Sequence, residues 1–294
     1  VDDTMIELAR SIPIFQPTVE EAVRGNPAAL LLVEFAEEDM AENERRLRQL
    51  HEMMGDLGFG WDKCTARRGG VVDAIEPGVQ GRIAEWRKSG LNIMMSEKSE
   101  AKPVSFLEDC AVELKDLAEY TDKLTAIFDR NGVKGTWYAH ASVGCLHVRP
   151  VLNMKQVGGA ETMRAIAEEA FELVRSFGGS HSGEHGDGIV RSEFNDRMFG
   201  PVLPDLFRQV KAMFDPQGMF NPGKITDAPK MDDRELFRFA PGYEAEDFDS
   251  VLDWAAWPGA SGGFQGAVEM CNNNGACRKL TGGVMCPSYR ATRN

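Results

Sequence analysis

Four of the five histidines in this 294-residue sequence occur in two tight groups near its middle. In the first group, His140 and His147 are separated by six residues. The second group lies in a glycine-rich segment, where Glu184 is followed directly by His185. Imidazole nitrogens and carboxylate oxygens are the ligands that zinc and similar divalent ions take in proteins, and a free imidazole is a common acid–base group.

A hairpin would bring the two histidines of the first group together. Residues 133–140 and 145–152 have the pattern of two strands joined by a turn at 142–144, so His140 and His147 can face one point. Glu184 can add a carboxylate from a turn where glycines allow close backbone approach, and His185 can titrate near neutral pH as a base. The alternative is that these are ordinary hydrogen-bonded histidines beside a flexible turn.

Two arginines are candidates for binding a substrate carboxylate, because a guanidinium can hold a carboxylate with two parallel hydrogen bonds. Arg149 lies two residues after His147, and therefore on the same face of the predicted strand. Arg87 lies in the segment Trp86-Arg87-Lys88 of a predicted helix. Both arginines could instead be ordinary surface residues.

Three of the six cysteines, Cys271, Cys277 and Cys286, fall in the last 24 residues. The first two can be aligned with Cys-x-x-Cys-Gly-x-Cys if Asn274 replaces the middle cysteine, and Cys286 precedes a proline, as in ferredoxin-type sequences. Three thiolates do not complete a four-thiolate site. The segment therefore predicts either the beginning of an iron–sulfur module or a reduced tail with free thiols.

The composition narrows the class of protein. With 43% hydrophobic residues the chain can bury a sizeable core, and a formal net charge of −13 makes a nucleic-acid backbone an unfavourable partner. No apolar run reaches the roughly 18 residues that a membrane span needs, so no transmembrane segment is predicted. The remaining cysteines are scattered singly rather than in a dense disulfide framework, and we expect a reducing, cytoplasmic location.

The elements that must position these residues can be read from hydrophobic periodicity. An apolar run at 30–35 and an alternating pattern at 104–112 predict strands before the hairpin. Helical patterns occur at 37–54, 79–89, 114–131, 161–177 and 204–214. Strand–helix units alternating with an antiparallel pair favour an α+β fold, in which helices pack on one face of an antiparallel sheet. Residues 226–270 have the composition of an extended linker that leads to a C-terminal tail.

Three motifs occur in one order along the chain. They are His140-x6-His147, Ser182-Gly183-Glu184-His185-Gly186-Asp187-Gly188, and Asp215-Pro216-x-Gly218-x-Phe220-Asn221-Pro222-Gly223-Lys224. With these motifs, about residues 25–226 resemble the C-terminal half of FAD-linked dehydrogenases of D-2-hydroxyacids. That family includes D-lactate, glycolate and D-2-hydroxyglutarate dehydrogenases of the vanillyl-alcohol-oxidase superfamily. In the family the first motif usually reads His-x-Gly-Asp-Gly-Asn-Leu-His, whereas here Ser142, Val143 and Cys145 replace the first glycine, the aspartate and the asparagine.

The resemblance implies a role for each residue of the histidine groups. His140, His147 and Glu184 would hold a divalent metal, zinc or similar, which would polarise the hydroxyl and carboxylate of the substrate. His185 would take the hydroxyl proton as hydride leaves for the flavin. Since both histidines of the altered first motif are present, the metal role carries over better than any polar contact made by its turn.

The resemblance also implies cofactors and partners. Asn221 and Lys224 match the segment that returns toward the flavin, while FAD itself would be held mainly by another domain of the same polypeptide. Electrons would pass to an iron–sulfur acceptor. The implied organisation is a connector (1–25), a substrate and metal domain (26–226), a linker (227–265) and the start of a truncated ferredoxin-like segment (266–294). This chain alone is expected to be inactive.

Two other functions use the same residues. A zinc hydrolase could bind metal with two histidines and one glutamate and keep water at the open position, although the sequence has no His-Glu-x-x-His helix. A non-catalytic domain could use the metal only for stability, as the altered turn between His140 and His147 suggests. Dependence on flavin separates the dehydrogenase from the hydrolase, and loss of folding rather than turnover in His147→Ala would indicate the scaffold.

Overall fold

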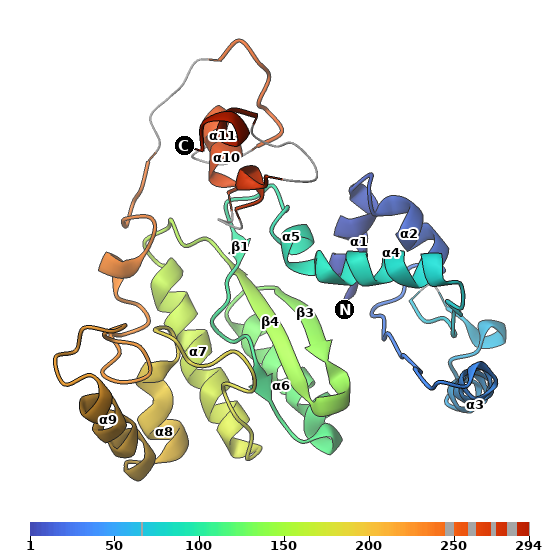
Figure 1. Ribbon diagram of the computed structural model, residues 1–294, viewed down its shortest axis with the longest axis horizontal. Helices are drawn as coiled ribbons and strands as arrows, with labels where there is room; N and C mark the ends of the chain where they lie inside the picture. Colours follow the sequence, from blue (N-terminus) through green and yellow to red (C-terminus); the bar gives the residue numbers. More distant parts are fainter. Residues whose placement is uncertain (66, 245–249, 258–262, 272–274, 281–286, 294) are drawn as a thin grey trace. The chain divides into compact units, whose positions relative to one another are not determined.

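The computed structural model describes the whole chain except residues 66, 245–249, 258–262, 272–274, 281–286 and 294 (Figure 1). The chain forms two compact units. The first contains residues 1–97 and 101–243, and the second contains residues 98–100 and 244–294. In the described part of the chain, no helix combines the length and the apolar character needed to cross a bilayer.

A small antiparallel sheet forms the centre of the first unit. Its longest strand, β4 (Cys145–Leu152), pairs along one edge with β3 (Gly135–His140) and along the other with β1 (Lys102–Pro103) and β2 (Cys110–Ala111). The hairpin β3–β4 turns through Gly144, which has a φ of +67°. A Cβ at this position would lie 2.0 Å from the carbonyl oxygen of Val112, so only glycine fits the turn.

Side-chain alternation along the hairpin sends its apolar residues to one face of the sheet. Leu146, Val148 and Leu152 are buried there in a core that also contains the inner faces of α6 (Leu117–Arg130) and α7 (Gly159–Ser176). The two helices lie side by side in Figure 1 and contact each other. The predicted α+β class, an antiparallel sheet with helices on one face, is therefore confirmed.

The predicted helices are all present, with small changes at their ends. Those expected at 37–54, 79–89, 114–131, 161–177 and 204–214 correspond to α3 (Met40–Asp56), α4 (Pro77–Lys88), α6, α7 and α9 (Val202–Phe214). The described residues also form shorter helices: α1 (Asp3–Ser11), α2 (Gln16–Ala22), α5 (Gly90–Met94), α8 (Asn195–Phe199), α10 (Gly263–Glu269) and α11 (Pro287–Thr292). Helices α1, α2, α4 and α5 bury a second apolar cluster around Ile6, Val19 and Ile93, which fixes the helix that carries Arg87.

The strand predicted at 30–35 is wrong. This segment is extended but belongs to no strand, and the side chains of Leu31 and Val33 are 74% and 47% exposed. The exposed edge of β3 is occupied near its middle by Asp2, whose N–H donates to the carbonyl of Trp137 and whose carboxylate accepts from the Trp137 N–H. An apolar run becomes a strand only where an edge is free to pair with it.

The strand predicted at 104–112 is much shorter than expected. Only Cys110 and Ala111 pair with β4 in this region, because the backbone turns sharply at Asp109, which has a φ of +85°. Residues 226–243 belong to the first unit, where Met231 is buried in the main core. The domain boundaries predicted at 25, 226 and 265 stay predictions.

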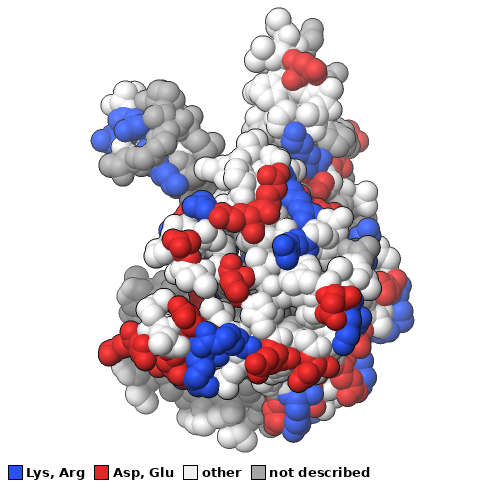
Figure 2. Space-filling view, turned by 90° about the vertical axis from the view of Figure 1, so that its right-hand side faces the viewer, with Lys and Arg blue, Asp and Glu red and all other residues white. Residues whose placement is uncertain are grey.

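Charges on the surface are mixed in sign. On the face shown in Figure 2, lysine and arginine side chains are interspersed with aspartate and glutamate rather than gathered in one area. Helix α3 shows the local pattern, because Glu42 pairs with both Arg45 and Arg46 on its exposed surface. Such pairs stabilise an exposed helix only slightly.

The packing predicts a clear difference between two leucine-to-alanine variants in helices. Leu124 of α6 is completely buried, so Leu124→Ala should lower the free energy of unfolding by about 2–5 kcal/mol. Leu206 of α9 is 45% exposed, so Leu206→Ala should change it by less than about 1 kcal/mol. Denaturant unfolding of the two variants measures the difference, and equal losses would contradict the described core.

Candidate active site

The sheet face opposite α6 and α7 carries polar side chains. In the register of the hairpin, Tyr138 lies opposite His147 and Thr136 lies opposite Arg149, with His140 at the end of β3. These residues alternate with those of the apolar core, so a single period-two pattern makes both the core and the polar face. His147 is only 5% exposed, because the segment after α7 covers it.

That covering segment, residues 180–188, is held against the sheet by backbone pairing. Ser180 and Ala111 exchange both of their N–H···O=C hydrogen bonds, each at 2.9 Å, and the Gly183 N–H donates to the carbonyl of Asp109 at 2.8 Å. A Cβ at Gly179 would lie 2.3 Å from the carbonyl oxygen of Ala111, so glycine is required for this close approach. The segment thereby brings Glu184 and His185 to the histidines of the hairpin.

Four of the predicted site residues form one cluster. One carboxylate oxygen of Glu184, Oε2, lies 3.8 Å from Nε2 of His140 and 3.7 Å from Nε2 of His147. The ligand atoms of these three residues all lie within 4.8 Å of one another. Nε2 of His185 is 3.7 Å from the same oxygen, and its ring stacks on that of His147 with centroids 4.9 Å apart and planes 9° apart.

The cluster fits a divalent metal in its chemistry and its dimensions. Two ligand atoms about 2.1 Å from a tetrahedral ion lie about 3.4 Å apart, and Oε2 of Glu184 is already 3.7–3.8 Å from the Nε2 atoms of both histidines. Burial lowers the pKa of His147, as do the neighbouring His185 and His140, while Glu108 and Glu184 oppose that shift. The net lowering favours the neutral imidazole, which is the form that binds a metal.

Two carboxylates that the sequence motifs did not predict lie beside this cluster. The first, Glu108, is a largely buried residue that accepts hydrogen bonds from Arg149 at 2.6 and 2.7 Å and from the Ser105 hydroxyl. Burial by itself raises the pKa of Glu108, but the bonds from Arg149 and Ser105 outweigh it, and the pKa lies below its usual value. Oε1 of Glu108 is 3.9 Å from Nδ1 of both His147 and His185.

The second is Asp109, which is fully buried. Its carboxylate accepts the backbone N–H groups of Glu184 and His185, each at 2.7 Å, and lies 3.5 Å from the thiol of Cys145. Burial tends to raise the pKa of Asp109, but the two backbone hydrogen bonds prevail and lower it. The pKa of the Cys145 thiol is raised to about 12 by burial and by Asp109, so Cys145 stays protonated. The sequence did contain a signal, because Glu108-Asp109 interrupts an otherwise apolar segment.

The two predicted substrate arginines both contact residues of the cluster or beside it, but they differ in their partners. The guanidinium of Arg149 is already paired with Glu108, and its side chain is 11% exposed. Arg87 comes from α4, and its Nη2 lies 3.5 Å from Nδ1 of His140. Arg149 is thus neutralised by a carboxylate, whereas Arg87 faces an imidazole.

The predicted flavin-contacting residues follow α9. Lys224 donates to the side-chain oxygen of Asn221 at 3.3 Å, and both side chains are exposed. The N–H of Ile225 lies 3.3 Å from the carbonyl of Gly188 and 3.1 Å from the Ser192 hydroxyl, which ties this segment to the end of the covering segment 180–188.

The C-terminal cysteines belong to the second unit. Cys271 and Cys277 are exposed, while Cys286 lies outside the described residues. Their assignment to an iron–sulfur module stays a prediction.

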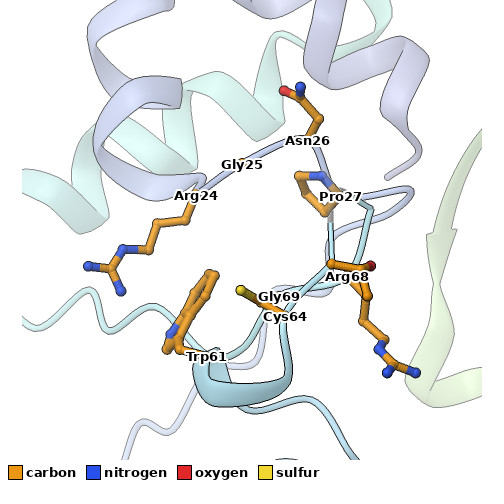
Figure 3. A pocket seen from close by; sticks show the side chains of 9 residues that line it. Arg24, Gly25, Asn26, Pro27, Trp61, Cys64, Arg68 and Gly69 are labelled. Atoms are coloured by element: carbon orange, nitrogen blue, oxygen red, sulfur yellow. The ribbon is translucent and has the colours of Figure 1, made fainter.

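A separate pocket of about 280 Å³ lies near the end of α2. Figure 3 shows the residues that line it. The Cys64 sulfur points into it beside the ring of Trp61, over which the Arg24 guanidinium lies at 4.9 Å, while Arg68 points away. Its lining includes no imidazole or carboxylate and none of the predicted site residues. None of the residues predicted to carry acid–base chemistry therefore lines this pocket.

Comparison with known proteins identifies the family. A sequence profile described as "FAD linked oxidases, C-terminal domain" matches residues 1–225. This chain belongs to that family. The resemblance seen in the three motifs is confirmed, and with it the FAD-linked nature of the family.

Curated relatives extend the similarity to the rest of the chain. D-2-hydroxyglutarate dehydrogenases of Pantoea ananatis (strain AJ13355) and Escherichia coli (strain K12) are 31% and 32% identical over alignments that cover 100% of this chain. A D-lactate dehydrogenase of Archaeoglobus fulgidus is 30% identical over 45% of this chain, which corresponds to 29% of that protein. The chain spans only 28% of the length of the two D-2-hydroxyglutarate dehydrogenases.

The two backbone hydrogen bonds to Asp109 predict the effect of an isosteric substitution. In Asp109→Asn, an amide replaces one oxygen of this buried carboxylate and leaves the N–H of Glu184 or His185 without an acceptor, at a cost of about 1–3 kcal/mol. We expect a lower unfolding free energy and faster hydrogen exchange at those two amides. The exposed Asp196 provides the control Asp196→Asn, and unchanged exchange in Asp109→Asn would contradict the described anchor.

Proposed function

We propose that this chain is the substrate- and metal-binding part of a FAD-linked dehydrogenase that oxidises a D-2-hydroxyacid to a 2-oxoacid. The observation that carries the proposal is the convergence of His140, His147 and Glu184 on one point, with His185 stacked beside them. Membership of the FAD-linked oxidases supports the reaction class. The relatives from Pantoea ananatis and Escherichia coli, which align with the whole chain, are D-2-hydroxyglutarate dehydrogenases, and this favours D-2-hydroxyglutarate or a close analogue as the substrate.

The metal role falls to three of the four clustered residues. His140, His147 and Glu184 would hold a divalent ion, zinc or similar, with at least one position open to the substrate. When bound, such an ion supplies Lewis-acid polarisation of the substrate's hydroxyl and carboxylate oxygens. Family membership favours the dehydrogenase over a zinc hydrolase that would use the same donor set.

His185 is the proposed base. Its side chain is 49% exposed, so a substrate can reach it, and its Nε2 lies on the same side as the proposed metal ligand Glu184. The hydroxyl proton of the substrate would move to Nε2 of His185 while the hydride on the same carbon leaves for the flavin. The products of that step are the 2-oxoacid, a protonated His185 and reduced flavin.

The remaining predicted residues would bind and orient the substrate and the flavin. Arg87 is the better candidate for the substrate carboxylate, because Arg149 is already neutralised by Glu108. Asn221 and Lys224 would contact the flavin held by the FAD-binding domain of the same polypeptide. Electrons would continue to an iron–sulfur acceptor that begins with Cys271, Cys277 and Cys286, in an enzyme located in the cytoplasm.

Metal binding can be tested on the purified chain. We expect about one zinc ion per chain, and we expect the double variant His140→Ala, His147→Ala to lose it because one carboxylate alone binds zinc weakly. Elemental analysis after dialysis measures the content. The control is His51→Ala, since His51 lies on α3 and pairs with Asp73 away from the cluster. Equal zinc in the wild type and the double variant would contradict the ligand assignment.

The role of His185 can be tested in the complete enzyme. His185→Ala should lower kcat for oxidation of the D-2-hydroxyacid by about 10²- to 10⁴-fold, the usual contribution of a positioned base, while the metal stays bound. Steady-state kinetics and metal analysis on the same preparation separate the two effects. If the variant loses metal together with activity, His185 is a ligand and the assignment as base is wrong.

A further inference from the structure

The Nδ1 atom of His147 is buried and has no hydrogen-bond partner among the described residues. A neutral histidine that gives Nε2 to a metal carries its proton on Nδ1, and metal-ligating histidines almost always donate that proton to a carboxylate or carbonyl. Such an acceptor keeps the ring in one tautomer and one orientation. The carboxylate closest to this role is Glu108, whose Oε1 is 3.9 Å from Nδ1 of His147.

Oε1 of Glu108 lies equally close to a second imidazole ring, that of His185. Nδ1 of His185 also lies 3.9 Å from Oε1 of Glu108, and the two imidazoles stack almost in parallel. Each ring therefore turns its Nδ1 edge toward Glu108 and its Nε2 edge toward Glu184. A movement of each ring toward this oxygen by about 1 Å would bring its Nδ1 atom to hydrogen-bond distance.

Hydrogen bonds from two other side chains fix the position of the Glu108 carboxylate. Arg149 donates to both carboxylate oxygens and the Ser105 hydroxyl donates to one of them, so the carboxylate stays charged and its freedom to rotate is small. Its side chain is 12% exposed, so water does not replace these partners. An anionic acceptor held in this way forms stronger hydrogen bonds than a neutral one.

We propose that Glu108 is a positioning residue that accepts Nδ1–H hydrogen bonds from both His147 and His185, and so aims the Nε2 atoms of the metal ligand and of the base at one point. This inference rests on the proposed function. It gives Arg149 a different role from the predicted one, since Arg149 holds the carboxylate of Glu108 and not that of the substrate.

The test compares Glu108→Gln with the wild type in the complete enzyme. The amide keeps the size of the side chain but removes the charge, and it can present an N–H in place of the acceptor. We expect zinc affinity, measured by chelator competition, to fall about 10- to 100-fold, as is typical for loss of such a partner. With zinc in excess, kcat should fall more than KM rises, because Nε2 of His185 loses its orientation while the substrate still binds. Zinc X-ray absorption should count the same number of protein ligands as in the wild type.

Two further variants distinguish positioning from general destabilisation. Glu113→Gln makes the same chemical change at an exposed glutamate that pairs with Lys115, and it should leave affinity and kinetics unchanged. Ser105→Ala removes a single hydrogen bond to Glu108 and should shift zinc affinity in the same direction by a smaller factor.

Three results would overturn the inference. Wild-type zinc affinity and kcat in Glu108→Gln would show that the carboxylate positions neither ring. Loss of one ligand in the absorption spectrum would show that Glu108 binds the metal directly, together with His147 and His185. A wild-type enzyme that oxidises the hydroxyacid without bound metal would overturn the metal part of the proposed function as well, and so differs from a failure of Glu108 alone.

Discussion

The site depends above all on the buried carboxylate of Asp109, which accepts the backbone N–H groups of Glu184 and His185. The segment after α7 is rich in glycine and would otherwise have many conformations. Asp109 fixes two consecutive amides of that segment, and it does so next to the strand that carries His147. Glu184 and His185 are thus placed through their main chain, which leaves both side chains free to face the histidines of the hairpin.

The two faces of the hairpin fix its register. One face is apolar and packs on α6 and α7, and the other carries the histidines and Arg149. Because the core face cannot slip by one residue without burying polar groups, the register of the hairpin is fixed by the core. The adjacent residues Glu108 and Asp109 contact different parts of the site. Glu108 faces the imidazole rings, and Asp109 faces the backbone that carries Glu184 and His185.

Much of this arrangement could be predicted from local pattern. The hairpin, the helices and the convergence of His140 with His147 follow from periodicity and spacing within a few residues. The strand expected at 30–35 failed because pairing depends on a free edge, and Asp2 lies at the edge of β3. The pairing of Arg149 with Glu108 joins residues 41 positions apart, and the left-handed backbone at Asp109 breaks a segment that looks like a strand. Such tertiary contacts cannot be predicted from local periodicity.

The proposed function depends on one metal ion bound by His140, His147 and Glu184. The most direct measurement is a crystal structure of zinc-loaded protein with anomalous differences collected on both sides of the zinc absorption edge. We expect one peak about 2.0–2.2 Å from Nε2 of His140, Nε2 of His147 and a carboxylate oxygen of Glu184. A peak instead among Asp109, Cys145 and His147, or no peak in zinc-loaded crystals, would contradict it.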